Sequence, residues 1–370
     1  MAGKADPMLS TVLSTVVAHP LSQQQLDDTQ SELSSALTDP GSFSNLWGLT
    51  DRILEFYTPT SSNDNTSTII SIFRSLLSNH GTLALMTDLK TIGRDQPKLR
   101  LFACYLKDTL LKPMKLAGVV DSVASTPASP SPHAARSITQ LAAVVQSSNR
   151  NRRKTKKDQC LMRDGHRCVF SHGYDVESVM DGLITTPADA EICGTQLAHV
   201  LPIALSKFDE DSQVEREAVA SVWFALYRYF PALDGKIGPN NLNQHANLVT
   251  LNIQVHNNFY DKHRLAFNPI DGQTDKYEIH NFTGHKLQAK PPQGHDQTIM
   301  TLVSYDNRYP LPHPEFFRAH YQIAKILHVS GIGKKIEAEM AASWNDPENV
   351  SPDGSTDLGS ILNRKMLINV

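Results

Sequence analysis

Gln196-Leu-Ala-His-Val-Leu-Pro202 is a short apolar run that ends at a proline. Such a run is typical of a β-strand, which stops where the proline ring removes the backbone N–H donor. His199 is therefore expected on a stiff element rather than in a loop. Apolar residues recur at helical spacing from Asp211 to Tyr229, which predicts an amphipathic helix, and the polar run 240–245 predicts a loop.

A second strand and a second helix follow this loop. Leu248 to Leu251 predicts the strand, and apolar residues return to helical spacing between Asn252 and His263. Asn247 opens the strand and His256 lies on the helix. A lone histidine in an apolar strand is usually a core residue, so the interpretation depends on the two histidines and the asparagine together.

This order of residues resembles the HNH endonuclease family, in which a ββα-metal finger holds one divalent ion between a β-hairpin and a helix. The flanking runs that extend the resemblance are Arg167-Cys-Val-Phe-Ser171, Ala198-His-Val-Leu-Pro202, Val255-His-Asn-Asn-Phe259, and Leu265-Ala-Phe267 followed by Tyr277-Glu-Ile279. Together they are similar to the branch of HNH proteins found mostly in fungi. The resemblance covers roughly residues 155 to 330.

The resemblance assigns a role to each of the three residues. His199 matches the general base, and imidazole suits proton transfer because its unperturbed pKa is about 6.5. His256 matches a metal ligand that binds through neutral imidazole. Asn247 matches the residue that braces the loop and orients the base, with Asn252 as a substitute.

The expected metal site departs from the family pattern at one position. Many HNH proteins have an aspartate or histidine immediately before the base, and here that residue is Ala198. With few protein ligands the ion depends on substrate oxygens and water, which suits Mg²⁺ or Mn²⁺ better than Zn²⁺, although Zn²⁺ stays open. Asp261 can supply an oxygen, as can Asn257, but positions i and i+5 do not share an α-helical face well.

A basic cluster precedes the finger. Six of the eight residues from Arg150 to Lys157 are basic, which suits contact with a phosphate backbone or with an import receptor. A merely solvated basic run is the alternative. The candidate nucleic-acid-binding residues are Arg150, Arg152, Arg153, Lys154, Lys156, Lys157, Arg163 and Arg167.

The rest of the chain predicts four regions. Residues 1–120 read as a helical bundle that either packs on itself or binds a partner or a second copy. Residues 121–149 form a Ser-, Pro- and Ala-rich linker with a short helix. Residues 150–335 form the nuclease-like domain, with a hairpin turning at Asp271-Gly272, and residues 336–370 form a polar tail.

Composition limits the class of protein. The net charge of −3 excludes a wholly basic nucleic-acid coat protein but allows a local basic patch. The four cysteines are too few for a disulfide framework in 370 residues. No secretory signal and no run of the ~20 apolar residues that span a bilayer is found, so we expect an intracellular protein of the nucleus or cytoplasm that does not bind membranes.

The sequence therefore predicts an α+β protein: a helical N-terminal domain, then an HNH ββα-metal finger with an inserted helix and a β-hairpin. The expected function is metal-dependent hydrolysis of phosphodiester bonds, with DNA favoured over RNA as the partner. The alternative is an HNH-fold module that binds nucleic acid or a protein without cleaving.

Overall fold

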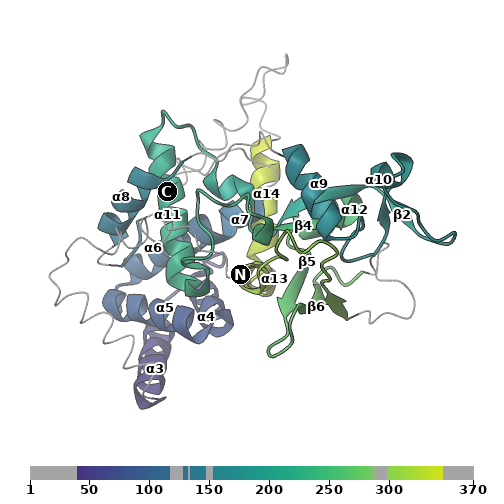
Figure 1. The fold of residues 1–370 in the computed structure, drawn as a ribbon. Helices are drawn as coiled ribbons and strands as arrows, with labels where there is room; N and C mark the ends of the chain where they lie inside the picture. Colours follow the sequence, from purple (N-terminus) through teal and green to yellow (C-terminus); the bar gives the residue numbers. More distant parts are fainter. Residues whose placement is uncertain are drawn as a thin grey trace.

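The computed structural model describes residues 40–116, 128–131, 134–146, 153–285, 287 and 298–344. Outside the described residues lie Arg150 and Arg152, residues 1–39 and 117–120 of the predicted bundle, a smaller part of the predicted linker, and the greater part of the predicted tail. Within the described ranges the chain mixes many helices with small sheets, which confirms the α+β class (Figure 1).

The N-terminal half of the described chain is helical, as its apolar spacing predicts. Its elements are α3 (Pro40–Phe56), α4 (Thr66–Leu76), α5 (Asn79–Ile92), α6 (Gln96–Leu106), the π-helical turn η1 (Lys107–Leu111) and α7 (Lys112–Leu116). Side-chain caps fix two of the starts: Ser78 accepts from the N–H of Gly81, and Asp95 accepts from that of Lys98. Each cap satisfies a backbone donor that a helix start leaves open.

The long helix α11 (Gln213–Tyr229) packs against both α5 and α8 (Ala134–Val144). The Asp88 carboxylate on α5 is buried and accepts from Arg228 at 2.8 and 2.6 Å and from the Tyr229 hydroxyl at 2.8 Å. A buried carboxylate is tolerated when it is paired and hydrogen-bonded in this way. Residues of both halves belong to one hydrophobic core, so the helical part and the strands are joined directly.

A three-stranded antiparallel sheet lies in the C-terminal part of the described chain. β5 (Leu265–Pro269) pairs with β6 (Lys276–Asn281), which pairs with β7 (Ile299–Thr301). The predicted hairpin is present, with Gly272 at φ 74°, whereas β7 was not expected. The helix α13 (Pro314–Val329) packs on β5, and α14 (Ile332–Trp344) continues past the predicted domain end with Ile336 buried.

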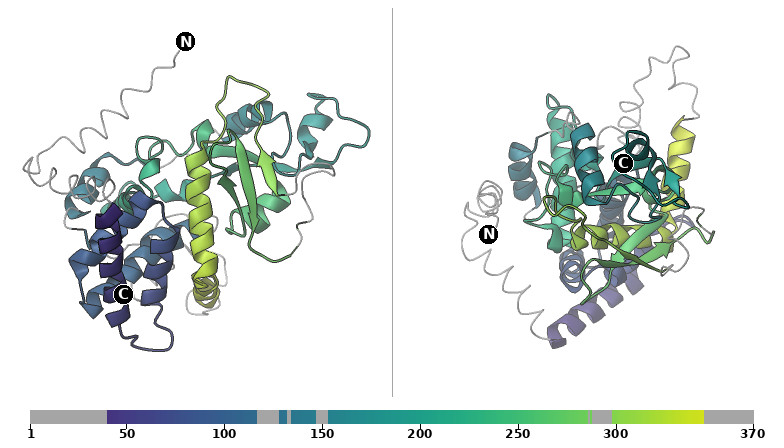
Figure 2. Two further views of the ribbon diagram at one scale, coloured as in Figure 1. Left: turned by 90° about the horizontal axis from the view of Figure 1, so that it is seen from below. Right: turned by 45° about the vertical axis from the view of Figure 1, so that its right-hand side comes forward.

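A separate two-stranded sheet consists of β3 (Thr195–His199) and β4 (Leu248–Asn252). Figures 1 and 2 place the helices α3 to α6 on one side of the molecule and the strands on the other, with α13 between them. The short elements are β1 (Tyr174–Asp175), α10 (Val176–Met180), β2 (Ile192–Cys193), η2 (Ile203–Ser206), η3 (Pro231–Leu233) and η4 (His245–Asn247). Across the described ranges no helix has the length and apolar character to cross a membrane.

Candidate functional site

The antiparallel pair β3 and β4 is the scaffold of the site. Its register sets His199 opposite Leu248 and Ala198 opposite Val249. Because side chains alternate along a strand, His199 and Leu197 emerge on one face, and Gln196 and Ala198 on the other. Leu197 and Leu248 pack with Cys160 of α9 (Arg153–Arg163). Ala198 and Val249 belong to the main core instead.

The ring of His199 contacts an asparagine that the sequence did not single out. Its Nε2 lies 3.0 Å from Oδ1 of Asn243, and the ring is partly buried. Asn243 comes from the polar loop 240–245, where composition predicts only a loop. An amide oxygen beside an imidazole N–H fixes the tautomer and orientation of the ring. Asn243 therefore contacts the ring that the resemblance expects Asn247 to orient.

Asn247 braces the backbone of the loop that follows β3. Its side chain is fully buried: Oδ1 accepts from the N–H of Leu201 at 2.8 Å, and Nδ2 donates to the carbonyls of Leu201 at 2.8 Å and Leu242 at 2.9 Å. Its own carbonyl accepts from the N–H of Val200 at 2.9 Å. Asn247 thus positions the chain immediately after His199 through backbone groups.

His256 has an oxygen beside each ring nitrogen. Nδ1 lies 2.7 Å from Oε1 of Gln196, and Nε2 lies 2.9 Å from Oδ1 of Asp261. The ring is 8% exposed. When Gln196 accepts from an Nδ1–H group, the lone pair of Nε2 faces the Asp261 carboxylate, and a proton or a cation between them relieves the repulsion.

A π-helical turn explains why Asp261 reaches His256. The helix α12 (Ile253–Val255) passes directly into the π-turn η5 (His256–Tyr260), and the N–H of Asp261 donates to the carbonyl of His256 at 3.1 Å. In a π-turn positions i and i+5 are hydrogen-bonded neighbours. The argument from α-helical spacing against Asp261 therefore does not apply to this segment.

The donor set fits a weakly held divalent cation in part. Nε2 of His256 and the carboxylate of Asp261 are suitable ligands on one side, and Asp261 is about one-third exposed. Ala198 is fully buried and adds no donor from β3. Among the described residues no group of three or more His, Cys, Asp and Glu side chains is arranged to hold a metal. Two protein ligands suit an ion such as Mg²⁺ or Mn²⁺, which retains several waters.

The two histidines have different surroundings. His199 lies on the α9 face of β3 beside Asn243, whereas His256 is reached from the opposite face by Gln196. A substrate that contacts both rings must therefore pass an end or an edge of the strand.

The described lysines of the basic cluster lie on α9. Lys154 is exposed on α9, Lys157 pairs with Glu177 at 2.7 Å, and Nζ of Lys156 lies 3.3 Å from Nδ1 of His245. Arg153 begins the same helix. The described part of the basic cluster, residues 153–157, therefore lies along α9.

Arg163 and Arg167 differ in how exposed they are to solvent. The side chain of Arg163 is fully buried, so the structure places it in the interior and not on a surface that a phosphate reaches. Arg167 lies at the surface, where its guanidinium stacks 4.7 Å from the centre of the Tyr305 ring.

A cavity of about 1150 Å³ lies beside the scaffold, lined by α9, α10 and β3. Lys154 and Lys157 line it on the helix side, and Gln196 lines it on the strand side. Because Gln196 also contacts His256, the cavity adjoins the candidate metal ligands. His245, on the other side of α9, is partly buried near Lys156 and Arg163, and burial lowers its pKa to about 4.

The comparisons with known proteins add no name to this geometry. No family model, no curated protein and no solved structure matches the chain.

Proposed function

We propose that this chain is a metal-dependent endonuclease of the HNH type that hydrolyses phosphodiester bonds of nucleic acid, DNA before RNA. The observation that carries the proposal is the continuous path from the antiparallel pair β3 and β4 into a helical turn that brings His256 and Asp261 together. Two strands and a helix in this order are the arrangement that the resemblance implies.

Each residue has a distinct role in the proposed reaction. His199, held by Asn243, accepts a proton from the attacking water. Asn247 fixes the backbone after His199. His256 and Asp261 bind the cation, and Gln196 keeps Nε2 of His256 turned toward it. A bound divalent cation polarises the phosphate and stabilises the leaving oxygen.

The proposal is tested by incubating the full chain with supercoiled plasmid and Mg²⁺ or Mn²⁺. We expect nicking, a loss of about 100-fold or more in His199→Ala, as for removal of a general base, and a raised Mn²⁺ requirement in Asp261→Asn. His280→Ala is the matched control, because that ring is on β6 and contacts Glu278. Full nicking by His199→Ala, or equal loss in the control, would overturn the assignment.

A second candidate function is binding without cleavage. Ala198 favours it, because its methyl group is buried on the face of β3 where a further ligand would belong. Titration with Mn²⁺ separates the two candidates: nucleic-acid binding by a folded chain that takes up no Mn²⁺ and cuts nothing supports the second. Metal uptake that is lost in His256→Ala supports the first.

We also infer that the protein works inside the cell, in the nucleus or the cytoplasm, since the run from Arg150 to Lys157 has the composition of an import signal.

The helical half is the proposed region for self-association or a protein partner. Phe56 and Leu101 are exposed there, on α3 and α6. Gel filtration of variants with Asp at these two positions tests this role.

A further inference from the structure

The segment 303–310, which no sequence motif marked, is fastened to the candidate site by the buried Arg163. The guanidinium donates to the carbonyls of His245 at 3.0 Å, Pro310 at 2.9 Å and Leu248 at 2.8 Å. The adjacent Asp164 carboxylate neutralises it at 2.7 and 3.0 Å. A buried charge with this many partners is costly to displace, so the segment is held firmly beside β4.

The same segment is fixed at its other end. The N–H of Tyr305 donates to the carbonyl of Arg163 at 2.7 Å. The Tyr305 ring lies against Gly165, where a Cβ atom would be 2.7 Å from the ring and φ is +68°. A glycine is required there, because only a bare backbone lets the ring approach so closely. Tyr305 is nevertheless 55% exposed, so part of its ring stays accessible.

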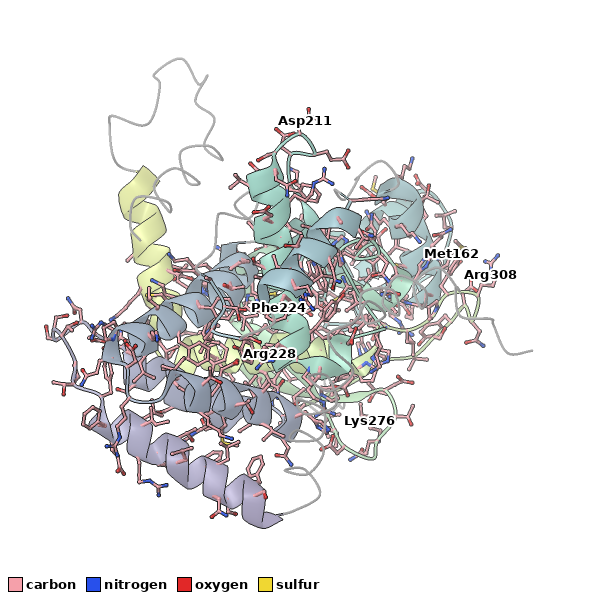
Figure 3. All side chains as sticks on the ribbon, turned by 90° about the vertical axis from the view of Figure 1, so that its left-hand side faces the viewer. Met162, Asp211, Phe224, Arg228, Lys276 and Arg308 are labelled. Carbon is pink, nitrogen blue, oxygen red and sulfur yellow. The ribbon has the colours of Figure 1, made fainter. Side chains whose placement is uncertain are left out.

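Cationic and aromatic side chains alternate along this surface. The guanidinium of Arg167 lies 4.7 Å from the Tyr305 ring centre, and that of Arg308 lies 5.6 Å from the Tyr309 ring centre. The Arg308 side chain is 69% exposed, and Asp306 holds it in place at 2.6 Å. Figure 3 shows Arg308 beside Met162 of α9 at one edge of the molecule, where Nη2 lies 3.8 Å from the sulfur.

Contacts continue from this surface to the candidate base. The Tyr309 ring stacks on His245 with centres 4.8 Å apart. His245 lies two residues after Asn243, whose amide contacts His199. The surface therefore begins at Arg167 and leads, through the Tyr309–His245 stack and the short chain segment from His245 to Asn243, toward the histidine that the proposed reaction uses.

We propose that the segment 303–310 and Arg167 form a track for an unpaired strand of the nucleic-acid substrate, with Tyr305 stacking on a base and Arg308 contacting phosphate. This inference rests on the proposed function. An exposed ring fixed by its backbone suits stacking, which accepts any base, and guanidinium groups between rings suit the phosphates. Tyr and Arg also anchor protein interfaces, but the lysines of α9 add further positive charge on this side.

Fluorescence anisotropy with a labelled 20-nucleotide single strand and the matching duplex tests the track, using the full chain in EDTA so that cleavage is excluded. We expect Tyr305→Ala to weaken binding of the single strand about 5- to 150-fold, the range for loss of one stacked base. Tyr305→Phe should restore most of the affinity. Arg308→Ala should lower the salt slope by about 0.7, as for one phosphate of a single strand.

The controls separate this inference from the proposed function. Arg318→Ala removes a partly exposed arginine that pairs with Asp271 and Glu315 instead, and should leave binding unchanged. Thermal unfolding of each variant confirms that it is folded. Binding by the wild type that is unchanged in Tyr305→Ala and Arg308→Ala, or a preference for duplex, overturns the track but leaves the proposed function standing. Absence of binding to any DNA or RNA removes both.

Discussion

The substitution Asn247→Ala should destabilise the protein more than any other change of a single polar residue in the finger loop. It removes three hydrogen bonds at 2.8, 2.8 and 2.9 Å in a fully buried site. The N–H and carbonyl of Leu201 and the carbonyl of Leu242 lose these partners. At about 1 to 1.5 kcal/mol for each bond, with little water to replace them, the expected loss is about 3 to 5 kcal/mol in the free energy of unfolding.

Urea unfolding followed by circular dichroism measures this loss, with Asn243→Ala as the matched control. Asn243 is partly exposed and contacts the ring of His199, so its removal should cost less than about 1 kcal/mol while lowering nicking. The reasoning predicts opposite profiles, with stability lost in one variant and activity lost in the other. A loss of under about 1 kcal/mol for Asn247→Ala would show that the loop does not depend on these bonds.

Three further changes test the packing around the site. Burial lowers the pKa of His320 to about 4, so the unfolded chain binds more protons than the folded chain below pH 6.5. The free energy of unfolding should therefore fall by about 3 kcal/mol between pH 6.5 and pH 4. The fall should be smaller in His320→Phe when the wild type and the variant are unfolded at each pH. In urea unfolding, Gly81→Ala should destabilise the protein by roughly 1 to 3 kcal/mol, because its Cβ would lie 2.1 Å from the carbonyl oxygen of Tyr229. Gly48→Ala should stabilise it by about 0.5 to 1 kcal/mol, because the nearest atom to its Cβ would be 3.9 Å away. Arg163→Lys should lower the thermal midpoint by several degrees, because one ammonium cannot reach the carbonyls that the guanidinium spans; an unchanged midpoint would contradict this.

Periodicity was enough to predict the main elements because they follow local rules. The helix predicted from Asp211 to Tyr229 is observed as Gln213–Tyr229, with Ser212 as its N-cap. The strand that ends before Pro202 and the strand that begins at Leu248 are observed as well. Their antiparallel pairing did not follow from periodicity and was expected only from the resemblance.

Contacts between residues far apart in the sequence could not be predicted from periodicity. Nothing in the spacing of residues shows that Asn243 rather than Asn247 contacts the His199 ring, because both lie within a few residues of the start of the same strand. Likewise, a run of basic residues gives no sign that Arg163 turns inward, since that depends on three carbonyls from other segments. The π-turn at His256 is a one-residue change in backbone bonding, which apolar periodicity does not resolve.

The arrangement of β3 restricts how the proposed reaction can take place. Its two faces carry different candidate residues, because His199 emerges toward α9 and Gln196 emerges toward His256. Among the described strands β3 pairs with β4 alone, so no described strand lies beside its other edge, and Thr195, Gln196 and Leu197 of β3 line the cavity. A phosphate that contacts both histidines must cross this edge or the end of the strand at His199. The lysines of α9 lie on the opposite wall of the same cavity, so positive charge is available where a strand of nucleic acid would enter.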